Sequence, residues 1–443
     1  MYDDTIVAVA TAAGEAGIGV VRLSGRDSLL IGRRLFRPTG KSCRYDSHHL
    51  YHGHILDGDD VVDEVLLAYM KAPRSYTAED VVEIHGHGGP MPLERILHLA
   101  IGHGARLANP GEFTLRAFVN GRLDLTQAEA VADVIHARSD ASLRLAVNQL
   151  SGRLSRAVDE TRRKVLGVLA QLEANIDFSE DDVPPVAAAK LLAELAPAHD
   201  DLCLLLRAAD EGILYRRGAR VAIVGRPNAG KSSLLNALLR TNRAIVTPIA
   251  GTTRDTIEEG INVRGLPMVL VDTAGITDTA DPIEAMGVGR SRQAIEEADL
   301  VLFVYDAAAG WTALDAELLP SNKRLLLVAN KRDLLSEPAN EQALFVSALT
   351  GEGLRELEAE LHRLLVPSSS TDDILVNNLR HKTLLEEAEE HLRDAMASVE
   401  QQRPADFVSI DLRAGLSALG TITGAEVSES LLDEIFSRFC IGK

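Results

Sequence analysis

Hydrophobic positions change their spacing along the chain, and the changes divide it into four stretches. In the first, residues 1–120, short apolar runs alternate with glycine-rich turns, and the runs predict strands over Thr5–Ala10, Val20–Leu23 and Val81–Ile84. Runs of this length bounded by turn residues are typical of β-strands. The first stretch therefore predicts a compact α+β domain.

The second and fourth stretches, residues 121–213 and 371–443, have helical spacing instead. One helical face in the second is marked by apolar residues at intervals of three and four, Leu125, Ala128, Val131, Ala132 and Ile135. Such spacing predicts amphipathic helices. A Ser-rich segment, Val366-Pro-Ser-Ser-Ser-Thr-Asp-Asp373, predicts a linker before the fourth stretch.

The third stretch, residues 214–370, alternates apolar strands with helical segments. The predicted strands are Arg220–Val224, Met268–Val271, Leu300–Tyr305 and Leu325–Ala329. Regular alternation predicts a parallel sheet covered by helices on both faces. Because helical stretches flank it, we expect this α/β domain to be inserted into a single helical domain, although consecutive domains would give the same periodicity.

The segment Gly225-Arg-Pro-Asn-Ala-Gly-Lys-Ser-Ser233 follows a predicted strand and opens a predicted helix. It matches the phosphate-loop pattern in its expected setting. Glycines allow backbone N–H groups to converge on a phosphate, and the helix N-terminus adds positive potential. We expect Lys231 to contact the β- and γ-phosphates and Ser232 to ligate Mg²⁺. This motif alone would also fit an ATPase.

Four further motifs follow in order and select guanine nucleotides. Thr253 is a predicted second Mg²⁺ ligand, and Asp272 and Gly275 are placed for the metal and the γ-phosphate. In Asn330-Lys-Arg-Asp333, the final carboxylate can accept two hydrogen bonds that guanine donates and adenine lacks. The predicted GTP-binding residues are Asn228, Ala229, Gly230, Lys231, Ser232, Ser233, Thr247, Pro248, Ile249, Ala250, Gly251, Thr252, Thr253, Asp272, Thr273, Ala274, Gly275, Asn330, Lys331, Asp333, Ser347, Ala348 and Leu349.

Hydrolysis requires a group that orients water, and Ile276 stands where Ras-like proteins carry glutamine. Asn228 could instead hold a monovalent cation beside the phosphates, with backbone carbonyls of Thr247–Thr252 completing the oxygen cage. Glu284 could polarise the water, although an isolated carboxylate there is more often an ordinary surface residue. Lys231 and Thr253 are the catalytic residues that these motifs predict, and the resemblance described below adds Glu284.

Composition narrows the class of protein. With 46% hydrophobic and 25% charged residues, the chain is typical of globular proteins, and its sequence predicts neither a secretory signal nor a membrane-spanning segment. Three separated cysteines argue against a disulfide framework or zinc knuckle and predict a cytoplasmic location. A net charge of −19 means that any RNA must meet a local basic patch or a partner's surface.

The whole chain resembles the MnmE (TrmE) family of tRNA-modifying GTPases. The segments that carry the resemblance are Asp4-Thr-Ile, Val21-Arg-Leu-Ser-Gly25, Glu79-Asp-Val-Val-Glu-Ile-His-Gly-His-Gly-Gly89, Pro110-Gly-Glu-Phe113, Asn120-Gly-Arg-Leu-Asp-Leu125 and Phe439-Cys-Ile-Gly-Lys443. The resemblance implies a homodimer whose nucleotide domains pair around K⁺, held by Asn228, Thr247, Ile249 and Thr252. It also implies that Glu284 orients the water. Thr277 departs from the family, where arginine can stand.

The same resemblance implies a folate-binding N-terminal domain with Arg22, Glu83, Arg122 and Lys443 as contacts. We therefore expect the C-terminal tail to lie near that domain, within one chain or across the dimer. The implied cofactor is a 5-formyl- or methylene-tetrahydrofolate. The implied reaction adds a carboxymethylaminomethyl group to the fifth carbon of the wobble uridine of certain tRNAs, together with an FAD-dependent partner of the MnmG (GidA) family.

Two other functional classes remain open. A ribosome-assembly GTPase would use GTP as a timer, but it predicts an appended RNA-binding module or tandem nucleotide domains. A folate-dependent one-carbon transferase with a regulatory GTPase would act without tRNA. Analysis of the wobble nucleoside in a strain that lacks the protein separates these classes.

Overall fold

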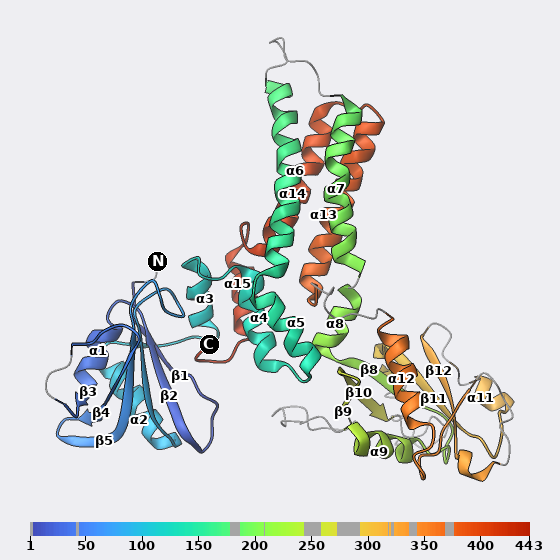
Figure 1. Cartoon of the computed structure of the whole chain (residues 1–443), viewed down its shortest axis with the longest axis horizontal. Coiled ribbons are helices and arrows are strands. Elements are labelled where there is room, and N and C mark those ends of the chain that lie inside the picture. The colour runs from blue at the N-terminus through green and yellow to red at the C-terminus, as the bar shows by residue number, and fades with distance from the viewer. Residues whose placement is uncertain are drawn as a thin grey trace. The chain divides into compact units, whose positions relative to one another are not determined.

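The computed structural model shown in Figure 1 describes residues 3–40, 44–177, 187–207, 209–242, 258–272, 293–317, 319, 323–335, 343–367 and 376–443. The chain forms two compact units. The first unit comprises Met1–Ala132, Leu150–Val158 and Leu419–Lys443, and the second comprises Asp133–Gln149 and Asp159–Ala418. Each unit is therefore assembled from segments that are distant in the sequence.

The first unit is built on a seven-stranded sheet with the order β3-β4-β5-β6-β2-β1-β7. Its strands are β1 Ile6–Val9, β2 Ala16–Ser24, β3 Phe36–Pro38, β4 His49–Asp57, β5 Asp60–Met70, β6 Val81–Gly88 and β7 Arg106–Leu107. The helices α1 Ser28–Leu35 and α2 Pro90–Gly102 bury their apolar residues against it. The three strands predicted from the first stretch are confirmed as β1, β2 and β6.

A buried charge network supports this sheet and involves residues from three of the segments that resemble the family. The fully buried Arg116 on α3 (Glu112–Val119) donates to Asp4 at 2.6 Å and to Glu112 at 3.0 Å. Arg106 also pairs with Asp4, and Glu79 contacts Arg116 at 3.2 Å. Breaking one partner would leave a buried charge uncompensated, so the network specifies how α3 joins the sheet.

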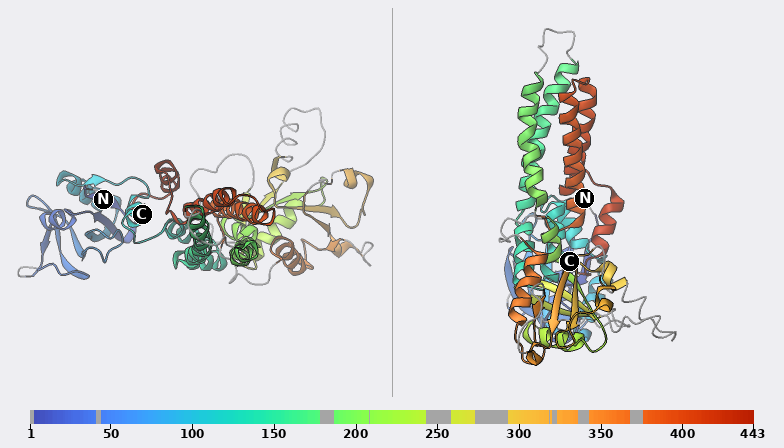
Figure 2. Two further views of the ribbon diagram at one scale, coloured as in Figure 1. Left: turned by 90° about the horizontal axis from the view of Figure 1, so that it is seen from above. Right: turned by 90° about the vertical axis from the view of Figure 1, so that its right-hand side faces the viewer.

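Helices complete both units. They are α4 Leu125–His136, α5 Asp140–Leu150, α6 Arg153–Asp177, α7 Ala188–Arg207, α8 Ala209–Arg217, α13 Leu379–Glu400, α14 Ala405–Thr423 and α15 Glu429–Ser437. In the second unit α7 packs along α13, and both views in Figure 2 show these helices side by side. The α/β domain lies between α7 and α13 in the sequence, as the predicted insertion requires.

The inserted domain has a six-stranded sheet with the order β13-β12-β11-β8-β10-β9. Its strands are β8 Ala219–Val224, β9 Glu258–Val263, β10 Leu266–Asp272, β11 Leu300–Asp306, β12 Leu325–Asn330 and β13 Leu344–Phe345. All neighbouring pairs are parallel except β9 with β10. The expected parallel sheet is thus correct for its centre, while a hairpin through Gly265 adds an antiparallel edge.

Two apolar clusters lie against this sheet, which indicates that both of its faces are covered. The described helices of the domain are α9 Lys231–Asn242, α11 Ala313–Glu317 and α12 Leu354–Leu365. Leu357, Leu361 and Leu365 on α12 are buried in the larger cluster. Within the described residues, no helix is long and apolar enough to span a membrane.

Candidate functional site

The phosphate loop connects β8 to α9, and its backbone carbonyls contact the ammonium group of Lys231. Lys231 Nζ donates to the carbonyls of Gly225 at 2.8 Å and Arg226 at 3.0 Å, and the residue is 7% exposed. A Cβ at Gly225, whose φ is +150°, would lie 1.9 Å from the Val304 carbonyl oxygen. Only glycine therefore allows the loop to approach β11 this closely.

A buried carboxylate anchors the same loop from outside. Arg226 Nε lies 2.7 Å from Asp315 Oδ1, and the Asp315 side chain is fully buried at the start of α11. Asp315 also accepts hydrogen bonds from the backbone N–H and the hydroxyl of Thr312. These contacts hold the loop in place before a nucleotide arrives, so less ordering is needed on binding.

The guanine-specifying motif lies beside the phosphate loop. Asn330 ends β12, and its amide nitrogen donates to the Ala229 carbonyl at 3.0 Å. Its amide oxygen accepts from the Ala348 N–H at 3.1 Å. Ser347 donates its hydroxyl to Asp333 at 2.5 Å. The structure thus brings the loop, Asn330-Lys-Arg-Asp333 and Ser347-Ala-Leu349 to one edge of the sheet.

An ion pair orients Lys331 at the same edge of the sheet. Its Nζ lies 2.7 Å from Asp306 Oδ2 at the end of β11. Burial raises the pKa of the Asp306 carboxyl, but the Lys331 ion pair and backbone N–H donors outweigh it and hold the pKa below its ordinary value. Asp306 therefore stays ionised at neutral pH and keeps the aliphatic stem of Lys331 in position. Asp306 lies outside the nucleotide-binding motifs, so the sequence did not predict its role.

Several predicted site residues lie outside the described residues. They are Thr247, Pro248, Ile249, Ala250, Gly251, Thr252, Thr253, Thr273, Ala274, Gly275, Ile276, Thr277 and Glu284. Asp272 is described as the last residue of β10, paired in register with Ile223 of β8, but its side chain is not. The second Mg²⁺ ligand, most of the K⁺ cage and the water-orienting carboxylate therefore stay predictions.

The residues predicted to contact folate, in contrast, lie close together in the first unit. They are Arg22, Glu83, Arg122 and Lys443. Arg22 on β2 and Glu83 on β6 are direct partners in the strand register, and Arg22 Nε lies 2.8 Å from Glu83 Oε1. Arg122 lies over the Tyr76 ring at 5.0 Å and donates to the Tyr76 carbonyl at 2.9 Å. The Arg22 guanidinium lies 5.4 Å from the same ring.

The chain terminus completes this cluster. Arg22 Nη1 lies 3.4 Å from the Gly442 carbonyl, and the N–H of Phe113 donates to the Lys443 carbonyl at 3.2 Å. The expected proximity of the tail to the N-terminal domain is therefore confirmed within one chain. Burial and the nearby Arg22 lower the pKa of the Lys443 ammonium, whereas Glu83 opposes that shift.

His85 and Tyr76 also belong to this cluster. His85 Nε2 lies 3.1 Å from Glu83 Oε2, and this hydrogen bond, with the Arg22 guanidinium, lowers the pKa of Glu83 although burial raises it. Tyr76 supplies the aromatic surface between the two arginines. His85 lies two positions from Glu83 on the same strand face, which was the available signal. No sequence spacing marked Tyr76.

Comparison with known proteins decides the family. A family model described as "MnmE helical domain" matches residues 125–440, and one described as "GTP-binding protein TrmE N-terminus" matches residues 5–122. The first match covers more than half of the 443 residues. The chain belongs to the MnmE family. Membership confirms the predicted fold class and the predicted enzyme class, a GTP hydrolase involved in tRNA modification.

Full-length relatives agree with this assignment to the MnmE family. The "tRNA modification GTPase MnmE" of Roseiflexus castenholzii is 49% identical over 467 residues, and 100% of both chains is covered. The protein of the same name from Synechococcus elongatus is 47% identical, with 99% of both chains covered. Among solved structures, a variant of Aquifex aeolicus Era bound to GDP and aluminium fluoride is 32% identical, covers 39% of this chain and 66% of that one, and has a TM-score of 0.29.

Proposed function

We propose that this MnmE-family chain is a K⁺-dependent GTP hydrolase that works with a flavoprotein of the MnmG (GidA) family on the wobble uridine of certain tRNAs. The product carries a carboxymethylaminomethyl group at C5 of the base. The observation that carries the proposal is that one chain combines a guanine-nucleotide corner with a separate charged cluster suited to a folate. Each site alone would fit several protein classes, but this combination favours a GTPase coupled to one-carbon chemistry.

In the nucleotide site, the described residues fit GTP and Mg²⁺. Lys231 can exchange the loop carbonyls for the β- and γ-phosphates when GTP binds. Ser232 is an exposed residue in the first turn of α9, and its hydroxyl would ligate Mg²⁺. The Asp333 carboxyl group, which accepts a hydrogen bond from Ser347, would accept the two donors on the guanine edge. Thr253 and Asp272 would complete the Mg²⁺ environment.

Potassium would supply positive charge beside the phosphates, in place of an arginine finger. Asn228 would hold it with oxygens from Thr247, Ile249 and Thr252, and nucleotide domains of a homodimer would pair around it. Glu284 would orient the attacking water. Asn228 adopts a positive φ of 63° within the loop, a conformation that asparagine tolerates better than most residues.

In the first unit, the charged cluster fits a reduced folate. The ionised Glu83 can accept hydrogen bonds from the donor edge of a pterin, and Tyr76 offers a flat aromatic surface. Arg22, Arg122 and Lys443 can attract the anionic glutamyl tail. A bound 5-formyl- or methylene-tetrahydrofolate would supply the one-carbon group, while the partner's flavin would supply the redox chemistry.

GTP turnover in different monovalent cations tests the hydrolytic part. We expect K⁺ and Rb⁺ to support hydrolysis and Na⁺ to fail. Asn228→Ala should lose this dependence, and the isolated fragment 214–370 should retain K⁺-stimulated hydrolysis without binding tetrahydrofolate. Equal turnover in Na⁺ and K⁺ would refute the role of the cation. A fragment that binds folate would refute the separation of the two sites.

A further inference from the structure

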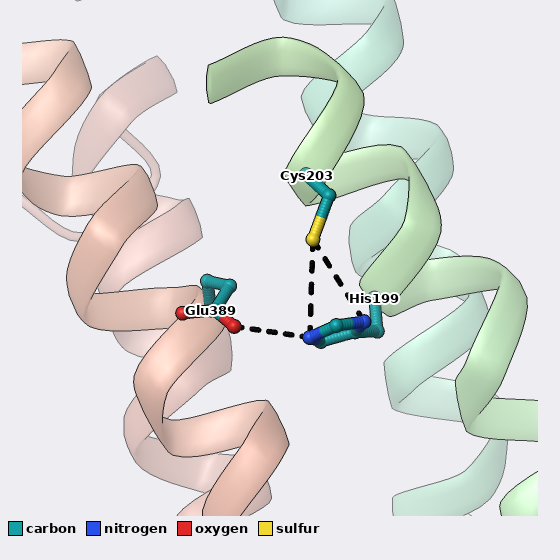
Figure 3. A group of neighbouring side chains, drawn as sticks. All are labelled: His199, Cys203 and Glu389. Carbon is teal, nitrogen blue, oxygen red and sulfur yellow. Dashed lines mark hydrogen bonds and ion pairs between the residues drawn. The ribbon is translucent and has the colours of Figure 1, made fainter. Parts of the chain in front are cut away.

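A cluster of three metal-ligating side chains lies on the helical bundle of the second unit. His199 and Cys203 are one turn apart on α7, and Glu389 faces them from α13 (Figure 3). His199 Nε2 lies 3.0 Å from Glu389 Oε1 and 3.9 Å from Cys203 Sγ. All three ligand atoms lie within 4.8 Å of one another. The cluster thus presents a nitrogen, a sulfur and an oxygen to one point.

These separations match those of ligands around a single tetrahedral ion. Bond lengths of about 2.3 Å to sulfur and about 2.0 Å to nitrogen or oxygen place such ligand atoms roughly 3.3–3.6 Å apart. The His199–Glu389 separation of 3.0 Å and the His199–Cys203 separation of 3.9 Å lie on either side of that range. The third pair, Cys203 and Glu389, lies within 4.8 Å, so rotations of these side chains would bring all three atoms to bonding distance of one ion. The two ligands on α7 come from a rigid helical turn, which fixes their spacing.

The surroundings of the cluster also suit a cation. The side chains of His199 and Glu389 are 27% and 18% exposed, so an ion can enter from solvent and keep a water molecule as its fourth ligand. Arg393 Nη1, one turn along α13, lies 3.3 Å from Glu389 Oε2 and 3.4 Å from Oε1. That contact can orient the carboxylate while Oε1 faces His199 and the ion, as outer partners of ligands commonly do.

We propose that His199, Cys203 and Glu389 bind one divalent transition-metal ion of the Zn²⁺ type and thereby clamp α7 to α13. A thiolate and an imidazole favour Zn²⁺ or Co²⁺ over the hard cations Mg²⁺ and Ca²⁺. On binding, the Cys203 thiol releases its proton to solvent as the sulfur–metal bond forms, and neutral His199 ligates through Nε2 with its proton on Nδ1.

The position of the clamp gives it a structural consequence. The helix α7 precedes the inserted α/β domain, and α13 follows it. A metal bridge between these helices would therefore join the two halves of the helical domain on either side of the insertion. Because the ion binds the folded pair better than the separated helices, it should raise the resistance of the bundle to unfolding.

Cobalt titration of the untagged full-length protein, reduced and saturated with Mg²⁺, tests the proposal. We expect one equivalent of Co²⁺ to give thiolate-to-metal charge-transfer absorption with strong d–d bands of four-coordinate geometry, and Zn²⁺ to remove both. Cys203→Ser should abolish the charge-transfer band, whereas the matched Cys440→Ser variant should retain it. His199→Ala and Glu389→Gln should each weaken binding more than about tenfold, compared with no change for Glu390→Gln on the exposed side of α13.

Circular dichroism and thermal melting distinguish a loss of metal binding from misfolding of a variant. Far-ultraviolet circular dichroism should show unchanged helicity, and Zn²⁺ should raise the melting temperature of the parent protein and of Cys440→Ser but not of Cys203→Ser. A charge-transfer band that survives in Cys203→Ser, or disappears in Cys440→Ser, would overturn the assignment. So would the absence of any band in the parent protein, since the cluster would then be only a His–Glu hydrogen bond beside a thiol.

Discussion

The nucleotide corner, formed by the phosphate loop and Asn330–Asp333, differs from the proposed folate cluster, formed by Arg22, Tyr76, Glu83, Arg122 and Lys443, in how the groups that would contact the ligand are held. In the nucleotide corner, the side chains of Lys231 and Asn330 donate hydrogen bonds to backbone carbonyls of the phosphate loop. Around the folate cluster, the key contacts join side-chain charges, as in the Arg22–Glu83 pair. The first site should therefore respond most strongly to changes in backbone geometry and base recognition, and the second to changes in charge and in the terminal tail.

The largest effect is expected for Asp333→Asn. Loss of the charged acceptor should weaken GTP binding by on the order of 10²–10⁴. Xanthine nucleotides, which present an acceptor at the corresponding edge, should bind the variant better than GTP does. Competition binding with both nucleotides measures the preference. Asp306→Asn is the control, since it removes the Lys331 partner but should leave guanine preferred. A variant at Asp333 that still prefers GTP would show that another residue recognises the base.

Paired glycine substitutions should separate the two sites. At Gly225 an added Cβ would meet the Val304 carbonyl at 1.9 Å, and at Gly442 it would meet the Val9 carbonyl at 2.4 Å. Each clash against backbone should cost about 2–4 kcal/mol locally. Gly225→Ala should therefore impair GTP binding alone, and Gly442→Ala should impair folate binding alone.

Gly167→Ala provides the reference for this pair, because its added Cβ has nothing within 4 Å on helix α6. It should leave both ligands bound normally and stabilise the helix by roughly 0.5–1 kcal/mol. Calorimetry with GTP and with 5-formyl-tetrahydrofolate measures all three variants. Equal loss of both ligands in either site variant would mean that the two sites are not independent.

Charge removal at Glu83 should have a somewhat smaller effect. Glu83→Gln loses charge-assisted hydrogen bonds worth about 1.5–3 kcal/mol, which corresponds to a folate affinity lower by roughly 10–100-fold. Removal of Lys443 should act in the same direction. GTP hydrolysis should remain near normal in both proteins. If folate affinity is unchanged in each variant, the folate site lies elsewhere in the chain.

The smallest expected effect is a pH dependence of stability. The His85 hydrogen bond and Arg22 lower the pKa of Glu83 below 4.5, so ionised Glu83 stabilises the folded state. This contribution is complete above pH 4.5 and is lost as the pH falls through the lower folded pKa. Urea denaturation should therefore show a difference between parent and Glu83→Gln at neutral pH that shrinks in acid. A constant difference would contradict the ionised state.

The nucleotide corner was largely predictable because its chemistry resides in short contiguous motifs. Gly225–Ser233 and Asn330–Asp333 each carry their own spacing, and the carboxyl ends of parallel strands bring them together. The antiparallel β9 was not predicted, because a short edge strand has little apolar signal of its own. Residues such as Thr253 and Glu284 lie outside the described part of the chain, so their roles are still predictions.

The folate cluster could be proposed only through family resemblance. Arg22 and Glu83 are 61 residues apart, Lys443 ends the chain, and nothing in their spacing indicates that the three lie close together. Strand register brings Arg22 opposite Glu83, and docking of the tail adds Lys443. Tyr76 joins the cluster through its contacts with Arg22 and Arg122, which form only in the folded domain. Long-range assembly of this kind cannot be read from periodicity.

Nucleoside analysis of tRNA tests the central claim, that both sites of this one chain serve modification of the wobble uridine. A strain lacking the protein would be complemented with the parent, with Asp333→Asn or with Glu83→Gln, each checked for equal abundance. The parent should restore the carboxymethylaminomethyl group at wobble C5, and each variant should fail, although Glu83→Gln retains GTP hydrolysis. Full restoration by either variant, or an unmodified nucleoside with the parent, would contradict the account.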